Sequence, residues 1–349
     1  MIASMDAGGA EQLVLQFTAD SLSRGDQAAV ASAGGAWTAR LESEVRHFDI
    51  PLVARSRFAV LSTAWRLRAV VRDVRPDVVH THNVGVTVAL RLAMVGMRKP
   101  APVVTTLHGL AHADYPTAAR ALARTGSTVV ACAPAVSRAL EAVGFPPARC
   151  RTIVNGAART PASAERIASV RSRLELSPCL VLGLGRLVDQ KAWPILIEAA
   201  QAFPEDVDVV VAGDGPLRRD LERLAAEAGG RVRFVGVVDD VAALLGAVTC
   251  LVSTSDWEGL PLSLLEALSL GVPSVVTRVD GVVDVVPPGV AVLVEPRDAA
   301  AVAAEVCGLL ADPTRRSSLT AAALASRSRW SPESMLEAYQ MVYGEVSGR

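Results

Sequence analysis

The stretch CLVSTSDWEGLPLSLLE, residues 250–266, reveals the fold of this chain. It opens with an apolar run of the kind found in strands buried on both faces of a parallel sheet. Gly259 then permits a sharp turn and Pro261 favours helix entry, so the stretch predicts a strand, a turn and a helix. Glu258 and Glu266 lie on either side of that turn. Open parallel α/β sheets bind ligands at this carboxyl edge.

Similar apolar runs recur along the chain with helix-like segments between them. This alternation predicts doubly wound α/β units with parallel sheets. A chain of 349 residues exceeds what one hydrophobic core organises, so two domains are expected. The strand expected before Ser4 is short, so we expect either that a few native N-terminal residues are missing or that the first methionine is misassigned. The other runs are residues 77–80, 103–107, 129–131, 180–182, 209–212 and 274–277.

Composition limits the classes of function. The five cysteines are scattered and lack metal-ligand spacing, so we expect reduced thiols in a cytoplasm and no metal site. No apolar run approaches the length of a bilayer span, and the N-terminus does not resemble a signal peptide. The first 151 residues carry 17 basic against 11 acidic side chains, which suits an anionic surface or substrate or a solvated basic face.

Two cations follow the run 180–182. Arg186 and Lys191 flank a turn beyond its carboxyl end, so both can converge on one site. Arginine offers a planar fork for phosphate oxygens and lysine a compact charge, which together suit a diphosphate. Gly8 and Gly9 follow the first strand and let backbone amides approach a phosphate or a sugar, although an ordinary flexible turn has the same pattern.

In their order along the chain, these motifs resemble the retaining, nucleotide-sugar-dependent glycosyltransferases of family 4. The resemblance implies the GT-B fold, with two facing Rossmann-like doubly wound domains, an interdomain cleft and a C-terminal helix that crosses back to the N-terminal domain. The segments that carry it are GGAE at 8–11, PDVVHTH at 76–82, LHG at 107–109, VNG at 154–156, GRL at 185–187 with Lys191, GDGPL at 213–217, and EGLPLSLLE at 258–266.

The resemblance also implies a role for each matching residue. The N-terminal domain, residues 1–160, binds the acceptor, residues 161–328 bind the nucleotide sugar, and residues 329–349 form the returning helix. Glu258 meets the transferred sugar and Glu266 the ribose, while His108 lies near the donor sugar. The catalytic residues implied are Glu258, His108, Lys191 and Arg186, and the donor-binding residues are Gly8, Gly9, Arg186, Lys191, Gly259, Leu260, Leu262 and Glu266.

The resulting hypothesis is a metal-independent, retaining hexosyltransferase without a cofactor. The donor is a nucleoside-diphosphate sugar, with UDP expected first and GDP next. The acceptor is the hydroxyl of a saccharide, a lipid-linked glycan or a small metabolite, and no nucleic acid is involved. Three alternatives remain: a nicotinamide-dependent oxidoreductase, which lacks the third fingerprint glycine because Val188 stands there; a nucleotide-sugar epimerase; and a non-catalytic sugar-nucleotide-binding protein.

Residues 55–75 form a basic amphipathic segment that allows two interpretations. Arginines alternate here with apolar residues such as Phe58 and Trp65. Such a helix can lie on anionic lipid at the inner face of a membrane, or it can be an ordinary surface helix packed on the sheet. At the strand ends, His82 is a further acceptor-side candidate and His80 a packing residue.

Overall fold

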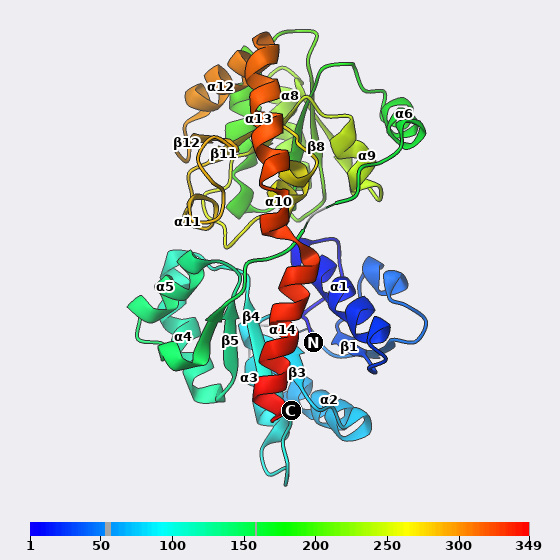
Figure 1. Ribbon diagram of the computed structural model, residues 1–349, viewed down its shortest axis with the longest axis vertical. Coiled ribbons are helices and arrows are strands. Elements are labelled where there is room, and N and C mark those ends of the chain that lie inside the picture. The colour runs from blue at the N-terminus through cyan, green and yellow to red at the C-terminus, as the bar shows by residue number, and fades with distance from the viewer. Residues whose placement is uncertain (53–56, 158, 349) are drawn as a thin grey trace. The chain divides into compact units, whose positions relative to one another are not determined.

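The structure is a computed structural model that describes residues 1–52, 57–157 and 159–348 (Figure 1). The chain forms two compact units. Unit 1 comprises Met1–Asn155 and Glu333–Arg349, and unit 2 comprises Gly156–Pro332. The chain thus passes from one unit to the other after Asn155, within the VNG segment, and returns after Pro332.

Unit 1 is built on parallel strands. They form a two-stranded sheet, β2-β1, and a four-stranded sheet, β3-β4-β5-β6. Residues 1–3 lie between them, because Ile2 donates its backbone N–H to Ala31 (3.0 Å) and His82 donates to Met1 (3.1 Å). The expected first strand therefore joins both neighbours by hydrogen bonds, although it is not itself a regular strand. The strands are β1 (Ala29–Ser32), β2 (Arg46–Asp49), β3 (Val79–Thr81), β4 (Val103–Leu107), β5 (Thr128–Ala131) and β6 (Cys150–Thr152).

The last helix, α14 (Pro332–Ser347), packs on the sheet of unit 1, as expected for a returning C-terminal helix. The hydroxyl of Tyr339 hydrogen-bonds the Thr106 hydroxyl (2.7 Å), and the hydroxyl of Tyr343 hydrogen-bonds Nδ1 of His80 (2.7 Å). Both contacts fix the helix over the strand ends of β3 and β4. The other helices of this unit are α1 (Gly9–Ser23), α2 (Arg57–Val74), α3 (Val84–Met94), α4 (Tyr115–Thr125) and α5 (Pro134–Ala142).

Unit 2 contains one six-stranded parallel sheet in the order β12-β11-β10-β7-β8-β9. Its first strand, β7, lies centrally beside β10, so the chain reverses its direction across the sheet between these two strands. This is the strand order of dinucleotide-binding domains, in which ligands bind at the switch point. The strands are β7 (Leu180–Leu184), β8 (Asp208–Ala212), β9 (Val232–Gly236), β10 (Cys250–Ser253), β11 (Ser274–Thr277) and β12 (Val292–Val294).

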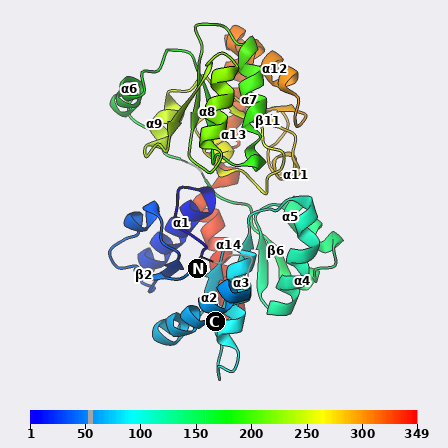
Figure 2. The same ribbon diagram turned by 180° about the vertical axis from the view of Figure 1, so that it is seen from behind.

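Helices cover both faces of this sheet: α10 and α13 lie toward the viewer in Figure 1, and α7 and α8 in the view from behind (Figure 2). A core centred on the fully buried Trp193 joins the strands to α7, α8 and α12. Burial on both faces explains why the interior strands read as continuous apolar runs. The helices are α6 (Ala164–Arg173), α7 (Trp193–Ala199), α8 (Arg218–Glu227), α9 (Val241–Gly246), α10 (Leu262–Ser269), α11 (Asp280–Val283), α12 (Ala299–Ala311) and α13 (Pro313–Ala325).

Candidate active site

Two loops meet at the switch point of unit 2. The loop after β7 ends in a short 3-10 helix, η4 (Asp189–Lys191), and the loop after β10 leads into α10. The N–H of Asp256 donates to the carbonyl of Gln190 (2.9 Å), and the Thr254 hydroxyl donates to the carbonyl of Lys191 (2.9 Å). These bonds hold the cationic loop against the acidic one.

Lys191 and Glu258 form a nearly buried ion pair at this junction. Nζ of Lys191 donates to Oε1 of Glu258 at 2.5 Å, and the two side chains are 14% and 8% exposed. Ser255 donates its hydroxyl to the same oxygen (2.7 Å), and Gln190 donates its amide to Oε2 (3.1 Å). Three donors from two loops therefore fix the position of one carboxylate.

This network leaves capacity for a ligand. A lysine ammonium has three N–H donors, and the contact with Glu258 uses one of them. A carboxylate has about four lone-pair positions, and three are used here. Lys191 can therefore donate to a phosphate oxygen, and Glu258 can accept from a sugar hydroxyl, while the pair stays intact.

Arg186 is a second cation of the loop that follows β7. Its side chain is exposed and makes no hydrogen bond or ion pair with any residue that the structure describes. Its carbonyl accepts from the indole of Trp193 (2.9 Å), which anchors the loop to the core. Gly185 lies under the Lys191 side chain, whose Cε would be 3.1 Å from an added Cβ. The missing side chain at 185 thus makes room for the lysine.

Ala192 links η4 to α7. It adopts the left-handed conformation, with φ 46° and ψ 43°, directly before α7. Glycine reaches this region without steric cost, whereas alanine is strained there. The loop nevertheless keeps its geometry, because the Thr254 hydroxyl also lies within 3.2 Å of the Ala192 carbonyl.

Glu266 is buried in the middle of α10 and paired with an arginine. Nε and Nη2 of Arg159 both donate to its Oε1, at 2.9 and 2.5 Å, and the residue is only 7% exposed. Burial raises the pKa of Glu266, and the Arg159 guanidinium opposes that rise. Oε2 accepts no hydrogen bond from the residues that the structure describes, so it can accept one from a ligand hydroxyl.

Gly259, Leu260 and Leu262 form the buried turn into α10. A second glycine, Gly281 at the start of α11, packs directly on this turn: a Cβ there would overlap the Gly259 carbonyl and lie 2.6 Å from the Glu258 carbonyl. Backbone atoms cannot yield as the end of a flexible side chain can. The glycine at 281 thus supports the turn that carries Glu258.

Gly281→Ala should accordingly lower the free energy of unfolding by about 2 kcal/mol and weaken binding at the turn, because the added methyl displaces backbone. Chemical denaturation measures the first effect. Gly308→Ala in α12 is the control, since its Cβ would meet only the Arg315 guanidinium at 3.2 Å. Equal stability of the two variants would contradict this account of Gly281.

In unit 1, Gly8 caps α1 and Gly9 is its first residue. The backbone N–H groups of this first turn have no partner within the helix and are ready donors. Gly8 has an extended backbone, and a side chain there would collide with the Glu11 carboxylate. The two glycines thus open a helix whose N-terminus suits an anion or a hydroxyl.

His108 follows β4 and pairs with His82, which follows β3. Nε2 of His108 lies 3.1 Å from Nδ1 of His82, and the two rings are stacked with an interplanar angle of 6°. Burial lowers the pKa of His82 well below its usual range, and His80 and His108 lower it further. His82 is therefore neutral near pH 7 and orients His108, while His80 packs against Tyr339 and Tyr343, as expected of a packing residue.

Three residues of these networks are absent from the sequence-based set: Gln190, Ser255 and Arg159. In the sequence, only proximity to the predicted residues could have indicated Gln190 and Ser255, because Gln190 adjoins Lys191 and Ser255 lies three residues before Glu258. Among the described residues, no group of three or more His, Cys, Asp or Glu side chains is arranged for a metal ion. No helix in the described part of the chain has the length and apolarity to cross a membrane.

Comparison with known families gives a match in each unit. Residues 7–158 match the family model described as Glycosyltransferase Family 4. Residues 178–312 match the model described as Glycosyl transferases group 1. The first match contains Gly8, Gly9 and His108, and the second contains the two loops at the switch point.

Individual proteins are similar over the same regions. The lipopolysaccharide core biosynthesis glycosyltransferase LpsD of Rhizobium meliloti (strain 1021) is 26% identical over 346 residues, covering 95% of this chain and 94% of that protein. LpsE of the same organism, described in the same words, is 40% identical over 104 residues, covering 29% of this chain and 30% of that protein. The crystal structure of Anabaena Alr3699/HepE in complex with UDP and glucose has a TM-score of 0.84 at 21% identity, covering 98% of each chain, which shows a shared fold.

Proposed function

Because the chain belongs to the family 4 glycosyltransferases with the GT-B fold, we propose that it transfers a sugar from a nucleoside-diphosphate sugar to an acceptor hydroxyl with retention. The Lys191–Glu258 pair at the β7/β10 switch point is the observation that carries this proposal. It places a phosphate-binding cation and a hydroxyl-binding carboxylate side by side, as the two halves of a sugar diphosphate require.

In this proposal, Arg186 and Lys191 bind the diphosphate and stabilise the negative charge that grows as the sugar departs. Glu258 accepts hydrogen bonds from the sugar and stabilises positive charge developing at its anomeric carbon. Glu266 accepts from a ribose hydroxyl through Oε2. Gly259, Leu260 and Leu262 shape the turn against which the nucleotide lies.

The reaction we propose needs neither a metal nor a cofactor, since two side-chain cations serve the diphosphate. The acceptor oxygen bonds to the anomeric carbon on the face from which the diphosphate leaves, so the anomeric configuration is retained. The bond between that carbon and the diphosphate oxygen breaks in the same step, and the departing diphosphate takes the proton of the acceptor hydroxyl. Transfer should therefore continue at an unchanged rate in EDTA.

We assign the acceptor to unit 1, where His82 is the acceptor-side candidate, while Gly8, Gly9 and His108 keep the roles toward the donor that the resemblance implies. The two similar Rhizobium proteins act in lipopolysaccharide core biosynthesis, which supports a saccharide or lipid-linked acceptor over a small metabolite. The similar Anabaena structure holds UDP and glucose, which supports UDP over GDP.

We further propose peripheral contact with an anionic membrane on the cytoplasmic side, through α2. Phe58, Leu61 and Trp65 are exposed on this helix, and all five cysteines of the chain are free thiols, as in a reducing compartment. Arg55 and Ser56, at the start of the predicted basic segment, lie outside the described residues.

Thermal unfolding with UDP, GDP, dTDP, ADP or NAD, and with the sugar nucleotides, tests the donor class. A nucleotide at 100 times its Kd should add about 2.7 kcal/mol to the stability of the native state and raise Tm by several degrees. We expect UDP and UDP-sugars to give the largest shift. Stabilisation by NAD alone would instead point to the oxidoreductase, and donor binding without turnover on any acceptor to a binding protein.

A further inference from the structure

Helix α2 of unit 1 has two apolar sides and buries only one of them. Leu67, Val70 and Val71 are buried in a core shared with α3. On the other side, Phe58, Leu61 and Trp65 are 86%, 60% and 75% exposed. Their spacing of three and four residues places them in one row along the helix. A row of three large exposed apolar side chains indicates a binding surface.

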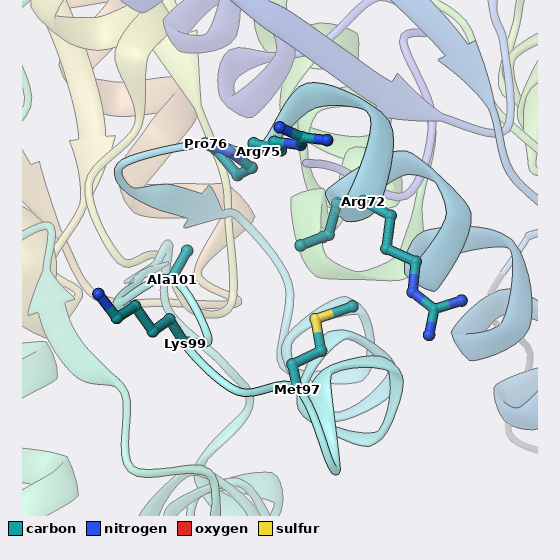
Figure 3. A pocket seen from close by; sticks show the side chains of 7 residues that line it. Arg72, Arg75, Pro76, Met97, Lys99 and Ala101 are labelled. Carbon is teal, nitrogen blue, oxygen red and sulfur yellow. The ribbon is translucent and has the colours of Figure 1, made fainter.

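A pocket of about 550 Å³ opens at the C-terminal end of the same helix (Figure 3). It is formed by two segments: the last turn of α2 with the residues that follow, and the loop between α3 and β4. In this view, Arg72 and Lys99 lie on opposite sides of it. The lining residues are Val71, Arg72, Arg75, Pro76, Met97, Lys99 and Ala101.

The pocket combines an apolar interior with cationic edges. Arg72, Arg75 and Lys99 are exposed, and none of them makes an ion pair or a side-chain hydrogen bond with the residues that the structure describes. Among the described residues, no carboxylate lines the pocket. The nearby Asp73 is paired with Arg46 at 2.5 Å. Three cations without acidic partners suit an anionic group, and the apolar lining suits its hydrocarbon part.

Two features connect the pocket to the exposed row. Arg72 follows Trp65 by seven residues, two helical turns, so its side chain continues the same face. Arg75 ends the helix in the left-handed conformation, with φ 50°, where glycine is favoured. A strained arginine at the edge of a pocket is consistent with a role in binding.

We propose that this pocket binds the phosphate-bearing headgroup of an anionic phospholipid while Phe58, Leu61 and Trp65 enter the interface of the bilayer. The proposal rests on the peripheral contact proposed above and names its ligand. Arg72, Arg75 and Lys99 bind the phosphodiester, and Val71, Met97 and Ala101 contact the glycerol and the first methylene groups. Apolar insertion and headgroup binding then act together, since neither alone gives a strong hold on the surface.

Co-sedimentation with vesicles of phosphatidylglycerol in phosphatidylcholine tests the proposal, without any nucleotide. The double variant Arg72→Glu, Lys99→Glu should bind at least tenfold more weakly than the wild type. The control is Arg120→Glu, which reverses one exposed charge on α4 and leaves all pocket residues unchanged. This variant should lose much less vesicle binding, because Arg120 lies outside the pocket. Phe58→Ser with Trp65→Ser should weaken binding in the same way, whereas Met341→Ser, 71% exposed on α14, should not.

Each outcome is decisive. An equal loss of vesicle binding for each reversed charge at positions 72, 99 and 120 would contradict headgroup binding in the pocket, because it would indicate attraction by net charge alone. Equal binding to pure phosphatidylcholine would overturn anionic recognition. Saturable binding of glycerol 3-phosphate or inorganic phosphate at micromolar concentration, with no vesicle binding, would assign the pocket to a free phosphate compound. The thermal shift that UDP induces in the same variants measures the nucleotide site independently of the membrane. A variant that loses vesicle binding but keeps this shift therefore separates the lipid proposal from the proposed transferase activity.

Discussion

Lys191→Met should lower kcat/KM for sugar transfer by about 100- to 1000-fold, since it removes a positioned cation from the departing diphosphate. It should also destabilise unit 2 by about 3 kcal/mol, because Glu258 stays buried without its charge partner. Glu258→Gln should have the same two effects for the complementary reason: it leaves the ammonium of Lys191 unpaired, at 14% exposure. Steady-state kinetics and chemical denaturation measure the two effects.

The double variant Lys191→Met, Glu258→Gln separates structure from chemistry. Removing both charges ends the burial of an unpaired ion, so the loss of stability should be smaller than the sum of the two single losses by more than 1 kcal/mol. Activity should not recover, because the diphosphate and the sugar have each lost a partner. Recovery of both stability and activity in the double variant would mean that the Lys191–Glu258 pair is only structural.

Arg297→Ala is the matched control for this ion pair. Arg297 donates to Asp256 at 2.9 and 2.8 Å, two residues from Glu258 along the chain, but its side chain is 75% exposed. An exposed pair contributes about 0 to 1 kcal/mol. We therefore expect normal transfer and nearly normal stability, whereas wild-type turnover in Lys191→Met would remove Lys191 from the mechanism.

The interior of both sheets could be predicted from the sequence because its strands are buried on both faces. All five residues of β4 are buried, and they coincide with the predicted run 103–107. The edge strands could not be predicted in this way. In β2, Arg46–Asp49, no residue is buried, and in β6, Cys150–Thr152, the residues are also half-buried or exposed. A strand that contacts solvent has no continuous apolar run, and three or four residues are too few for a clear alternation.

The parts of the candidate site that follow strand ends could likewise be predicted. Lys191 and Glu258 come after β7 and β10, and neighbouring parallel strands bring their carboxyl ends together. The Arg159 contact with Glu266 could not be predicted, since the two residues are 107 positions apart and the VNG segment that precedes Arg159 does not indicate a partner in α10. A long-range pairing of this kind depends on how the connecting segment crosses α10, which only the folded chain defines.

Arg159 should control the protonation of Glu266 and hence the affinity for the donor. Burial already raises the pKa of Glu266, and the guanidinium at 2.5 and 2.9 Å opposes this. Without Arg159, the pKa rises further and the carboxyl group becomes protonated at a higher pH. A protonated carboxyl group is a weaker acceptor for a ribose hydroxyl than a carboxylate. Donor binding should then weaken as the pH falls.

Arg159→Ala should therefore raise the KM for the nucleotide sugar by about 10- to 100-fold near neutral pH, the equivalent of one charge-assisted hydrogen bond, with a smaller change in kcat. The deficit should shrink as the pH rises from 6 to 9, since ionisation restores the acceptor. Arg159→Lys should recover part of the affinity. Arg166→Ala is the control: Arg166 makes a similar two-pronged contact with Asp240, at 2.8 and 2.7 Å, on the surface of the same unit. A pH-independent loss in Arg159→Ala would mean that Arg159 supports only the fold, because a purely structural defect would not follow the ionisation of Glu266.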